Sequence, residues 1–140
     1  MSKVRIVVVE NNRFWRELIS AVLRNNPTFE IICEVVDGLQ AVLMAEKLQP
    51  TIVLMDINIP RLNGIDAARW IRKLVPDSRI VFLSEQRDLE IVQAALNFAC
   101  GYVVKSDAAT DLVRAIDSVA VGKSFVSQQL QGLGLVGNCE

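Results

Sequence analysis

The chain of 140 residues contains no histidine. The commonest general base and the commonest zinc ligand of proteins are therefore excluded. Cysteine is scarce: Cys33, Cys100 and Cys139 are odd in number and irregularly spaced, which is typical of reduced, mostly structural thiols in a cytosolic protein. Cys100 directly precedes Gly101 at the end of a predicted helix, so we expect it to be packed and unreactive.

Excess charge and long apolar runs are also missing. The net charge is −1, from 15 basic and 16 acidic residues, and the absence of a basic cluster argues against nucleic-acid binding by this chain alone. No apolar stretch approaches the length of a bilayer span, and the first residues lack the pattern of a signal peptide. We therefore expect a cytoplasmic protein with no membrane contact. At 51% hydrophobic residues, the chain should form one domain with a full core.

Strand-like and helix-like segments alternate along the chain. The apolar, β-branched segments predicted to be strands are residues 4–9, 31–36, 51–55, 79–83 and 102–104. Each is followed by a helical pattern, the first of which Asn12 is expected to cap and the last Ser106 or Asp107. Five such units imply right-handed crossovers and helices on both faces of the sheet. The prediction is a doubly wound α/β domain with a five-stranded parallel sheet.

Four of the predicted strands end in polar residues of different chemistry. Glu10 and Asn11 follow the first strand, Asp56 the third, Ser84 the fourth and Lys105 the fifth. Ligands of open parallel sheets bind outside the carboxyl ends of the strands, so these side chains should line one crevice. Carboxylates, a hydroxyl and an ammonium together suit a phosphoryl group and a divalent cation.

Each of these residues also has an ordinary structural interpretation when it is taken alone. Asp56 could cap a turn, and Glu10 and Asn11 could cap the first helix. Lys105 alone would be a solvated charge at a strand end. Only their joint placement at the ends of neighbouring strands favours a binding site.

Three sequence segments resemble the receiver domain of bacterial two-component response regulators. They are VLMDINIPRLNG, VFLS and GYVVKSDAATDLVRAI, and the resemblance covers about residues 3–122. The stretch KSDAATDL is similar to the NarL-like subgroup, whose members carry a LuxR-type helix-turn-helix output domain. The resemblance implies a flavodoxin-like (βα)5 receiver fold over residues 1–122, followed at 123–140 by a linker or C-terminal tail, expected to be a helix extension or frayed.

The resemblance also implies a role for each polar strand end. Asp56 would be the phosphoacceptor for a sensor histidine kinase. Glu10, Asn11, Asp56 and the backbone carbonyl of Asn58 would bind Mg²⁺. The Ser84 hydroxyl and the Lys105 ammonium would bind the phosphoryl oxygens. Together with Ser84, Tyr102 would be the switch residue, an aromatic side chain that moves inward when Ser84 moves.

Two residues depart from the family pattern. Asn11 stands where the family has an aspartate, and an amide oxygen carries no charge. We hypothesise weaker Mg²⁺ binding and slower or absent phosphorylation; alternatively, reduced repulsion around Asp56 would bias the site toward an active-like state. Glu85 occupies a position that is usually small and would narrow access for a phosphodonor.

The first functional hypothesis is a phosphorylation-controlled switch that is no enzyme beyond its own phosphoryl gain and loss. Its output would be transcriptional and would act through the fourth helix, fifth strand and fifth helix, as a homodimer or by contact with an output domain. DNA would bind only through an output domain absent from this chain. The alternative is a phosphorylation-independent pseudo-receiver for protein interaction or dimerisation, because Asn11 weakens the metal site. An enzyme phosphorylating a metabolite is disfavoured because the sequence offers no second nucleophile and no histidine.

Overall fold

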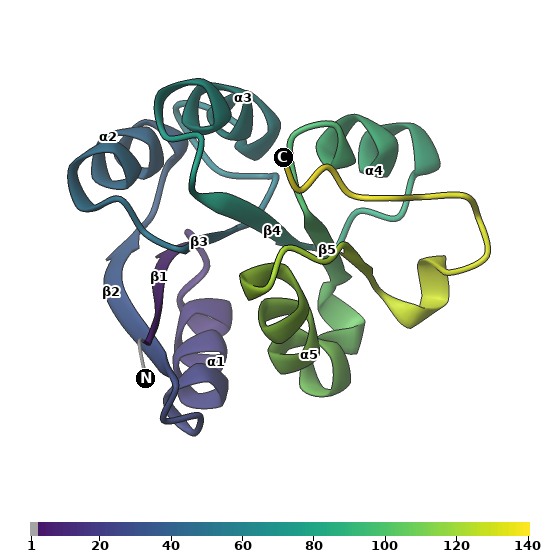
Figure 1. Ribbon diagram of the computed structural model, residues 1–140, viewed down its shortest axis with the longest axis horizontal. Helices are drawn as coiled ribbons and strands as arrows, with labels where there is room; N and C mark the ends of the chain where they lie inside the picture. The colour runs from purple at the N-terminus through teal and green to yellow at the C-terminus, as the bar shows by residue number, and fades with distance from the viewer. Residues whose placement is uncertain (1–2) are drawn as a thin grey trace.

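The computed structural model describes residues 3–140 and contains one six-stranded parallel sheet, in the order β2-β1-β3-β4-β5-β6 (Figure 1). The strands are β1 (Val4–Val9), β2 (Phe29–Val35), β3 (Ile52–Met55), β4 (Arg79–Ser84), β5 (Gly101–Val104) and β6 (Phe125–Val126). The helices are α1 (Arg13–Arg24), α2 (Gly38–Leu48), α3 (Gly64–Leu74), α4 (Leu89–Leu96) and α5 (Ala108–Ala120), with short 3-10 turns at Lys105–Asp107 and Gln128–Leu130. The doubly wound architecture is confirmed.

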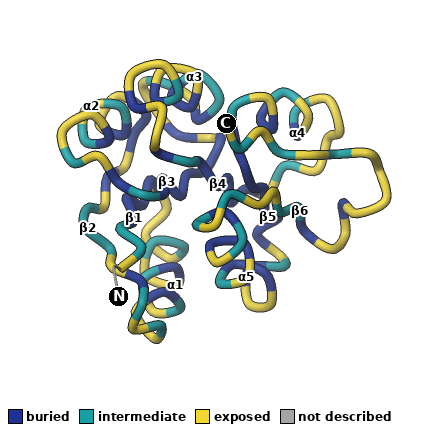
Figure 2. Tube along the Cα trace, in the orientation of Figure 1, coloured by how far each residue is buried: buried dark blue, intermediate teal, exposed yellow. Residues whose placement is uncertain are grey.

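Two hydrophobic clusters lie on opposite faces of the sheet. Val7 and Val9 of β1 pack with α2, α3 and α4, whereas Ile6 and Val8 of the same strand pack with α1 and α5. This division follows from the period of two residues by which side chains alternate along a strand. The central strands are accordingly buried on both faces, as Figure 2 shows, and read as continuous apolar runs.

Side-chain caps fix where most of the helices begin. Asn12 Oδ1 accepts a hydrogen bond from the backbone N–H of Trp15 at 3.1 Å, which confirms the predicted cap of α1. Of the two residues predicted to cap α5, Asp107 occupies the N-cap position, but neither it nor Ser106 makes a capping hydrogen bond with its side chain, because the chain enters this helix through a 3-10 turn. Both side chains instead accept hydrogen bonds from Gln129 Nε2, at 3.0 and 2.9 Å.

The C-terminal segment, residues 123–140, corrects the expectation of a helix extension or frayed tail. Its strand β6 pairs with β5, so the sheet has six strands and not five. A disulfide joins Cys139 to Cys100, which overturns the expectation of reduced thiols and leaves Cys33 as the free cysteine. A two-residue strand has too little periodicity to be recognised, and spacing alone does not determine cysteine pairing. No helix within residues 3–140 is long and apolar enough to cross a bilayer.

Gly38 provides a test of the packing between α2 and the loop that follows β3. A Cβ atom at Gly38 would collide with the backbone carbonyl of Leu62, and the Gly38 N–H donates to the Pro60 carbonyl at 3.2 Å. We expect Gly38→Ala to lower the free energy of unfolding by about 1–3 kcal/mol in urea denaturation, because the clash involves backbone. The control Glu46→Ala, on the exposed side of α2, should change it by less than about 0.5 kcal/mol. Equal midpoints for the two variants would contradict this packing.

Candidate functional site

The carboxyl ends of four neighbouring strands converge at one edge of the sheet. Parallel register places the end of β1 beside the end of β3, through the pair Val9↔Met55, and the end of β4 beside that of β5, through Ser84↔Val104. Glu10, Asp56 and Lys105 are the residues that follow β1, β3 and β5. The sheet therefore brings Glu10, Asp56 and Lys105 together as predicted, whereas the fully buried Ser84 is not among the residues that line the cavity there.

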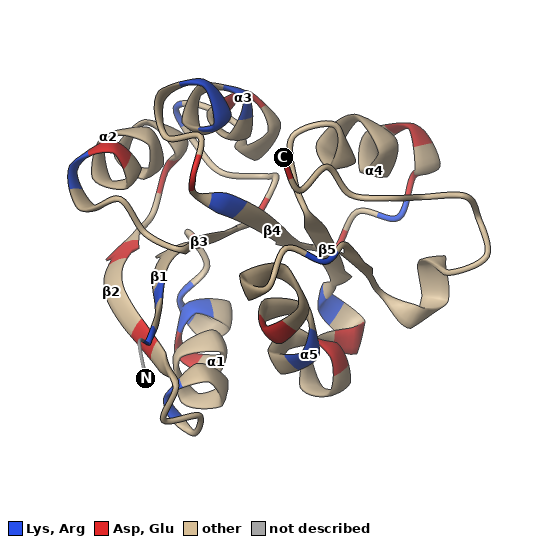
Figure 3. Ribbon diagram, viewed as in Figure 1, with Lys and Arg blue, Asp and Glu red and all other residues tan. Residues whose placement is uncertain are grey.

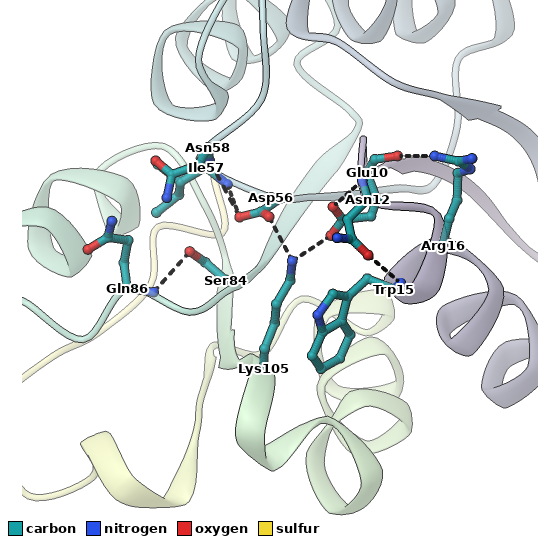
Figure 4. A network of polar contacts seen from close by, with 10 residues as sticks. All are labelled: Glu10, Asn12, Trp15, Arg16, Asp56, Ile57, Asn58, Ser84, Gln86 and Lys105. Carbon is teal, nitrogen blue, oxygen red and sulfur yellow. Dashed lines mark hydrogen bonds and ion pairs between the residues drawn. The ribbon is translucent and has the colours of Figure 1, made fainter.

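Lys105 lies between two carboxylates at the centre of this edge (Figure 4). Its Nζ is 2.8 Å from Asp56 Oδ2 and 2.8 Å from Glu10 Oε1. All three residues are buried, with exposed fractions of 6% for Lys105, 7% for Asp56 and 1% for Glu10. The three formal charges sum to −1, so the cluster has a net negative charge in a poorly solvated position.

The Asp56 carboxylate is oriented by the backbone that follows it. Its Oδ1 accepts hydrogen bonds from the N–H groups of Ile57 at 2.7 Å and Asn58 at 3.4 Å. Its Oδ2 accepts a hydrogen bond from Lys105 Nζ at 2.8 Å. The backbone thus fixes Oδ1, and Oδ2 contacts the Lys105 ammonium.

Glu10 is held through its side chain and its backbone. Oε2 accepts from the N–H of Asn12 at 3.0 Å, and Arg16 Nη1 donates to the Glu10 carbonyl at 3.0 Å. Oε1 contacts Lys105 only as an ion pair, without the geometry of a hydrogen bond. This buried oxygen therefore keeps unused capacity to bind a cation.

Burial and ion pairing shift the pKa values of Glu10 and Lys105 in opposite directions. Burial raises the pKa of Glu10 above its ordinary value, an effect that the ion pair with Lys105 and the hydrogen bond from the Asn12 N–H only partly offset and that the Asp56 charge reinforces. Burial by itself would lower the pKa of Lys105, but its hydrogen bond to Asp56, its ion pair with Glu10 and the charges of both carboxylates outweigh burial and raise that pKa. Lys105 consequently stays protonated at neutral pH.

A cavity of about 300 Å³ opens over the cluster. The residues that line it are Glu10, Asn11, Asn12, Trp15, Asp56, Asn58, Glu85 and Lys105. Asn11 and Asn58, both exposed, border the cavity with the carboxylates. No group of three or more histidine, cysteine or acidic residues suited to a metal occurs within residues 3–140. Asn11 thus leaves the site with two carboxylates.

Ser84 and Tyr102 lie deeper and share a backbone partner. The Ser84 hydroxyl accepts from the Gln86 N–H at 3.2 Å, and the Tyr102 hydroxyl donates to the Gln86 carbonyl at 2.8 Å. Both side chains are fully buried. Burial raises the pKa of Tyr102 to about 12; the Ser84 hydroxyl opposes this increase and the Asp56 charge adds to it. Any movement of the Gln86 backbone would therefore affect the residues predicted to switch.

Two functional contacts come from α1 and were not predicted. The Trp15 ring lies 4.9 Å from Lys105 Nζ, and Arg16 binds the Glu10 backbone. The local sequence of α1 predicts only an amphipathic helix capped by Asn12 and no ligand or positioning role. The sequence does contain a signal for these contacts. Trp15 and Arg16 lie in the first turn after the cap Asn12, so they follow closely after the end of β1.

Comparison with known proteins gives consistent matches over most of the chain. Residues 6–117 match the family model described as response regulator receiver domain. The transcriptional regulatory protein DegU of Brevibacillus brevis is 34% identical over 126 residues, which cover 89% of this chain and 53% of DegU. The transcriptional regulatory protein MctR of Rhizobium johnstonii is 30% identical over 126 residues, covering 89% of this chain and 59% of MctR. The chain therefore spans little more than half the length of these relatives.

Solved structures with the same fold include receiver domains. A LuxR-family two-component response regulator from Aurantimonas sp. SI85-9A1 superposes with a TM-score of 0.87 at 28% identity, covering 92% of this chain and 93% of that one. The signal receiver domain of the putative response regulator NarL from Mycobacterium tuberculosis gives a TM-score of 0.84 at 27% identity, covering 88% and 100%.

The buried phenol gives a direct test of the environment beneath the site. Tyr102 is the only tyrosine of the chain, so the near-ultraviolet absorbance of tyrosinate reports on it alone. We expect a titration midpoint at a pKa of about 12. The folded state favours the neutral phenol, so stability should fall as the pH rises above the ordinary value of about 10. Tyr102→Phe should show no signal, and the unfolded protein should titrate at the ordinary value. A native midpoint near that value would contradict burial of the ring.

Proposed function

The chain belongs to the response regulator receiver domain family, and on this premise we propose that it is a signalling switch whose Asp56 accepts a phosphoryl group from a sensor histidine kinase. The observation that carries the proposal is the buried contact of Lys105 Nζ with both Asp56 and Glu10, at 2.8 Å each. A cation and a second carboxylate beside an oriented aspartate are what phosphoryl transfer to that aspartate requires.

The proposed transfer forms one bond and breaks one. An oxygen of Asp56 attacks phosphorus, and the bond from phosphorus to the kinase histidine breaks, leaving its electron pair on that nitrogen. The main-chain bonds to Oδ1 hold the carboxylate still while Oδ2 faces the cavity with Lys105. The product carries about −1.5 to −2 of charge where the carboxylate carried −1, and Lys105, whose pKa is raised, remains protonated to offset part of it.

Mg²⁺ is the cofactor that we propose for this site. Glu10 Oε1, an Asp56 oxygen, the Asn58 carbonyl and the Asn11 amide oxygen would hold it; Glu10 Oε1 is buried and accepts no hydrogen bond, and its contact is the ion pair with Lys105. When bound, Mg²⁺ supplies charge neutralisation at the transferred phosphoryl oxygens.

Further parts of the proposal concern output and partners. Ser84 would turn its hydroxyl to the new phosphoryl oxygens, and the buried Tyr102 would report that movement to α4 and β5 through Gln86. The surface of α4, β5 and α5 would pass the signal on by homodimerisation or contact with an output domain. The names of DegU and MctR as transcriptional regulatory proteins support transcription as the output, and a cytoplasmic location would follow.

A second candidate function is a pseudo-receiver that acts without phosphate. Two observations favour it: Asn11 adds no charge to the cavity, and Glu85 adds a carboxylate to the cavity lining where an anionic donor would enter. Either feature would slow phosphorylation while preserving the fold as an interaction module.

Phosphorylation itself separates the two candidates. We expect incubation with acetyl phosphate and Mg²⁺ to add the mass of one phosphoryl group to the intact protein, because a small donor requires no kinase. Asp56→Asn should abolish the adduct, whereas Asp117→Asn, at an exposed position of α5, should retain it. Mass spectrometry of the intact chain measures the result. No adduct on the parent protein would favour the pseudo-receiver.

The amide at residue 11, in place of a carboxylate, should lower the affinity of the site for Mg²⁺. We expect Asn11→Asp to tighten Mg²⁺ binding on the order of tenfold, because charge on the ligand set governs affinity for hard cations. Trp15 lines the cavity and Trp70 lies exposed on α3, so Trp15 fluorescence in a Trp70→Phe background isolates the site.

Asn12→Asp is the matched control for this variant. It adds the same charge beside the cavity at a position that caps α1 and keeps an oxygen acceptor for Trp15. It should gain much less affinity. Equal gains in both variants would show that the effect is general electrostatic attraction and not ligation by residue 11.

A further inference from the structure

The C-terminal segment forms a loop that starts and finishes beside Cys100. From β6 and the turn Gln128–Leu130 the chain runs outward, reverses and returns alongside α4 (Figure 1). Gly132 and Gly134 in this segment have positive φ. Gly137 N donates to Ser124 Oγ at 2.7 Å, and Cys139 is disulfide-bonded to Cys100. The two ends of the loop are thus tied together at the start of β5.

The returning part of the loop is fitted closely to the end of α4. Asn138 N donates to the Ala99 carbonyl at 2.8 Å, and Asn138 Nδ2 donates to the Asn97 carbonyl at 3.0 Å. Arg72 Nη1 of α3 donates to the Asn138 carbonyl at 2.8 Å. A Cβ atom at Gly137 would collide with the Cys100 carbonyl, so the close approach depends on a glycine.

The outgoing part of the loop reaches the carboxyl end of β5. Ser127 N donates to the Tyr102 carbonyl at 2.9 Å, and Ser127 Oγ accepts from Val104 N at 2.8 Å. Gln129 Nε2 donates to Ser106 Oγ at 3.0 Å. The loop therefore binds the β5 backbone before Lys105 and the Ser106 side chain after it, and it covers the outer edge of β5.

The loop has no charged group of its own between residues 124 and 139 (Figure 3). Its attachment rests on hydrogen bonds, on the buried Leu130, on Leu135 against the core, and on the disulfide. Cys100 is fully buried, whereas Cys139 is partly exposed. In the cytoplasm that we propose for this protein, disulfides are typically transient or redox-sensing.

We propose that Cys100 and Cys139 form a reversible redox latch that fixes the C-terminal segment over β5 and α4. A dithiol reductant opens it by attacking the accessible Cys139 sulfur through a thiolate, which releases Cys100 as a thiol. The second thiol of the reductant then displaces Cys139, so the reductant gains the disulfide and both cysteines end as thiols. Exchange with a disulfide-bonded partner closes the latch again.

Opening the latch uncovers the edge of β5 and the surface beside α4. This consequence rests on the proposed function, which assigns output to α4, β5 and α5; the latch itself rests only on the cytoplasmic location proposed there and does not require phosphorylation. The oxidised protein would keep that surface covered, and the reduced protein would offer it to a second copy of the chain.

Hydrogen exchange of the whole chain, followed by mass spectrometry, tests the latch. On reduction with dithiothreitol we expect amides of residues 123–140 to exchange at least about tenfold faster, while the central strands β1 and β3 keep their protection. Protection should return after reoxidation with oxidised dithiothreitol. Cys139→Ser should show the fast pattern without reductant, and Cys33→Ser, on β2, should behave like the parent protein in both states.

Three results would overturn the latch: three free thiols in the unreduced protein, unchanged protection of the segment after reduction, or failure to recover protection on reoxidation. Dimer formation by the uncovered surface is measured separately. The mass of the phosphorylated Cys139→Ser variant in analytical ultracentrifugation shows whether two copies associate. A segment that is released without dimer formation would leave the latch intact and reject α4, β5 and α5 as the dimer surface.

Discussion

The buried contact of one ammonium with two carboxylates is the interaction on which the rest of the structure depends. Lys105 reaches Asp56 and Glu10 only because three parallel strands end at the same level of the sheet. Removing two acids and a base from water is costly, and the geometry must be good for their attraction to offset the cost. The Trp15 ring beside Nζ and the main-chain bonds to Asp56 Oδ1 supply part of that geometry. The fold thus holds one ammonium between two carboxylates, and an added phosphoryl group or cation would change the net charge of this cluster.

Asn11 alters this balance without disturbing the architecture. The amide is exposed at the mouth of the cavity, so it contributes an oxygen where a third carboxylate would have added charge. The burial of Glu10, which raises its pKa, already disfavours ionisation there. In the function that we propose, a site with one acid fewer would carry less repulsion at rest and would attract divalent ions less strongly. Both consequences would follow from this one residue.

Sequence reasoning located the strands and the polar strand ends because both are local signals. Apolar runs of β-branched residues indicated β1, β3 and β4 closely, and Asp56 and Lys105 followed directly from where such runs stop. The contacts of Lys105 with Asp56 and Glu10 could be inferred only from the parallel topology, because it determines which strand ends lie side by side. The pairing of Cys100 with Cys139 and the strand β6 depend on contacts between distant residues, for which the local sequence offers no period. The role of Trp15 was missed for a related reason: its partner is a side chain from the far end of the chain.

The two-residue length of β6 has a consequence for the behaviour of the protein in solution. A sheet whose last strand is very short presents few unpaired backbone groups to other molecules, and native proteins blunt edges in this way. The loop that carries β6 then folds back beside it, so the longer and wholly apolar β5 behind it is withheld from intermolecular strand addition. Protection of this sheet edge is consequently provided by residues 123–140, which lie outside the matched family region, residues 6–117.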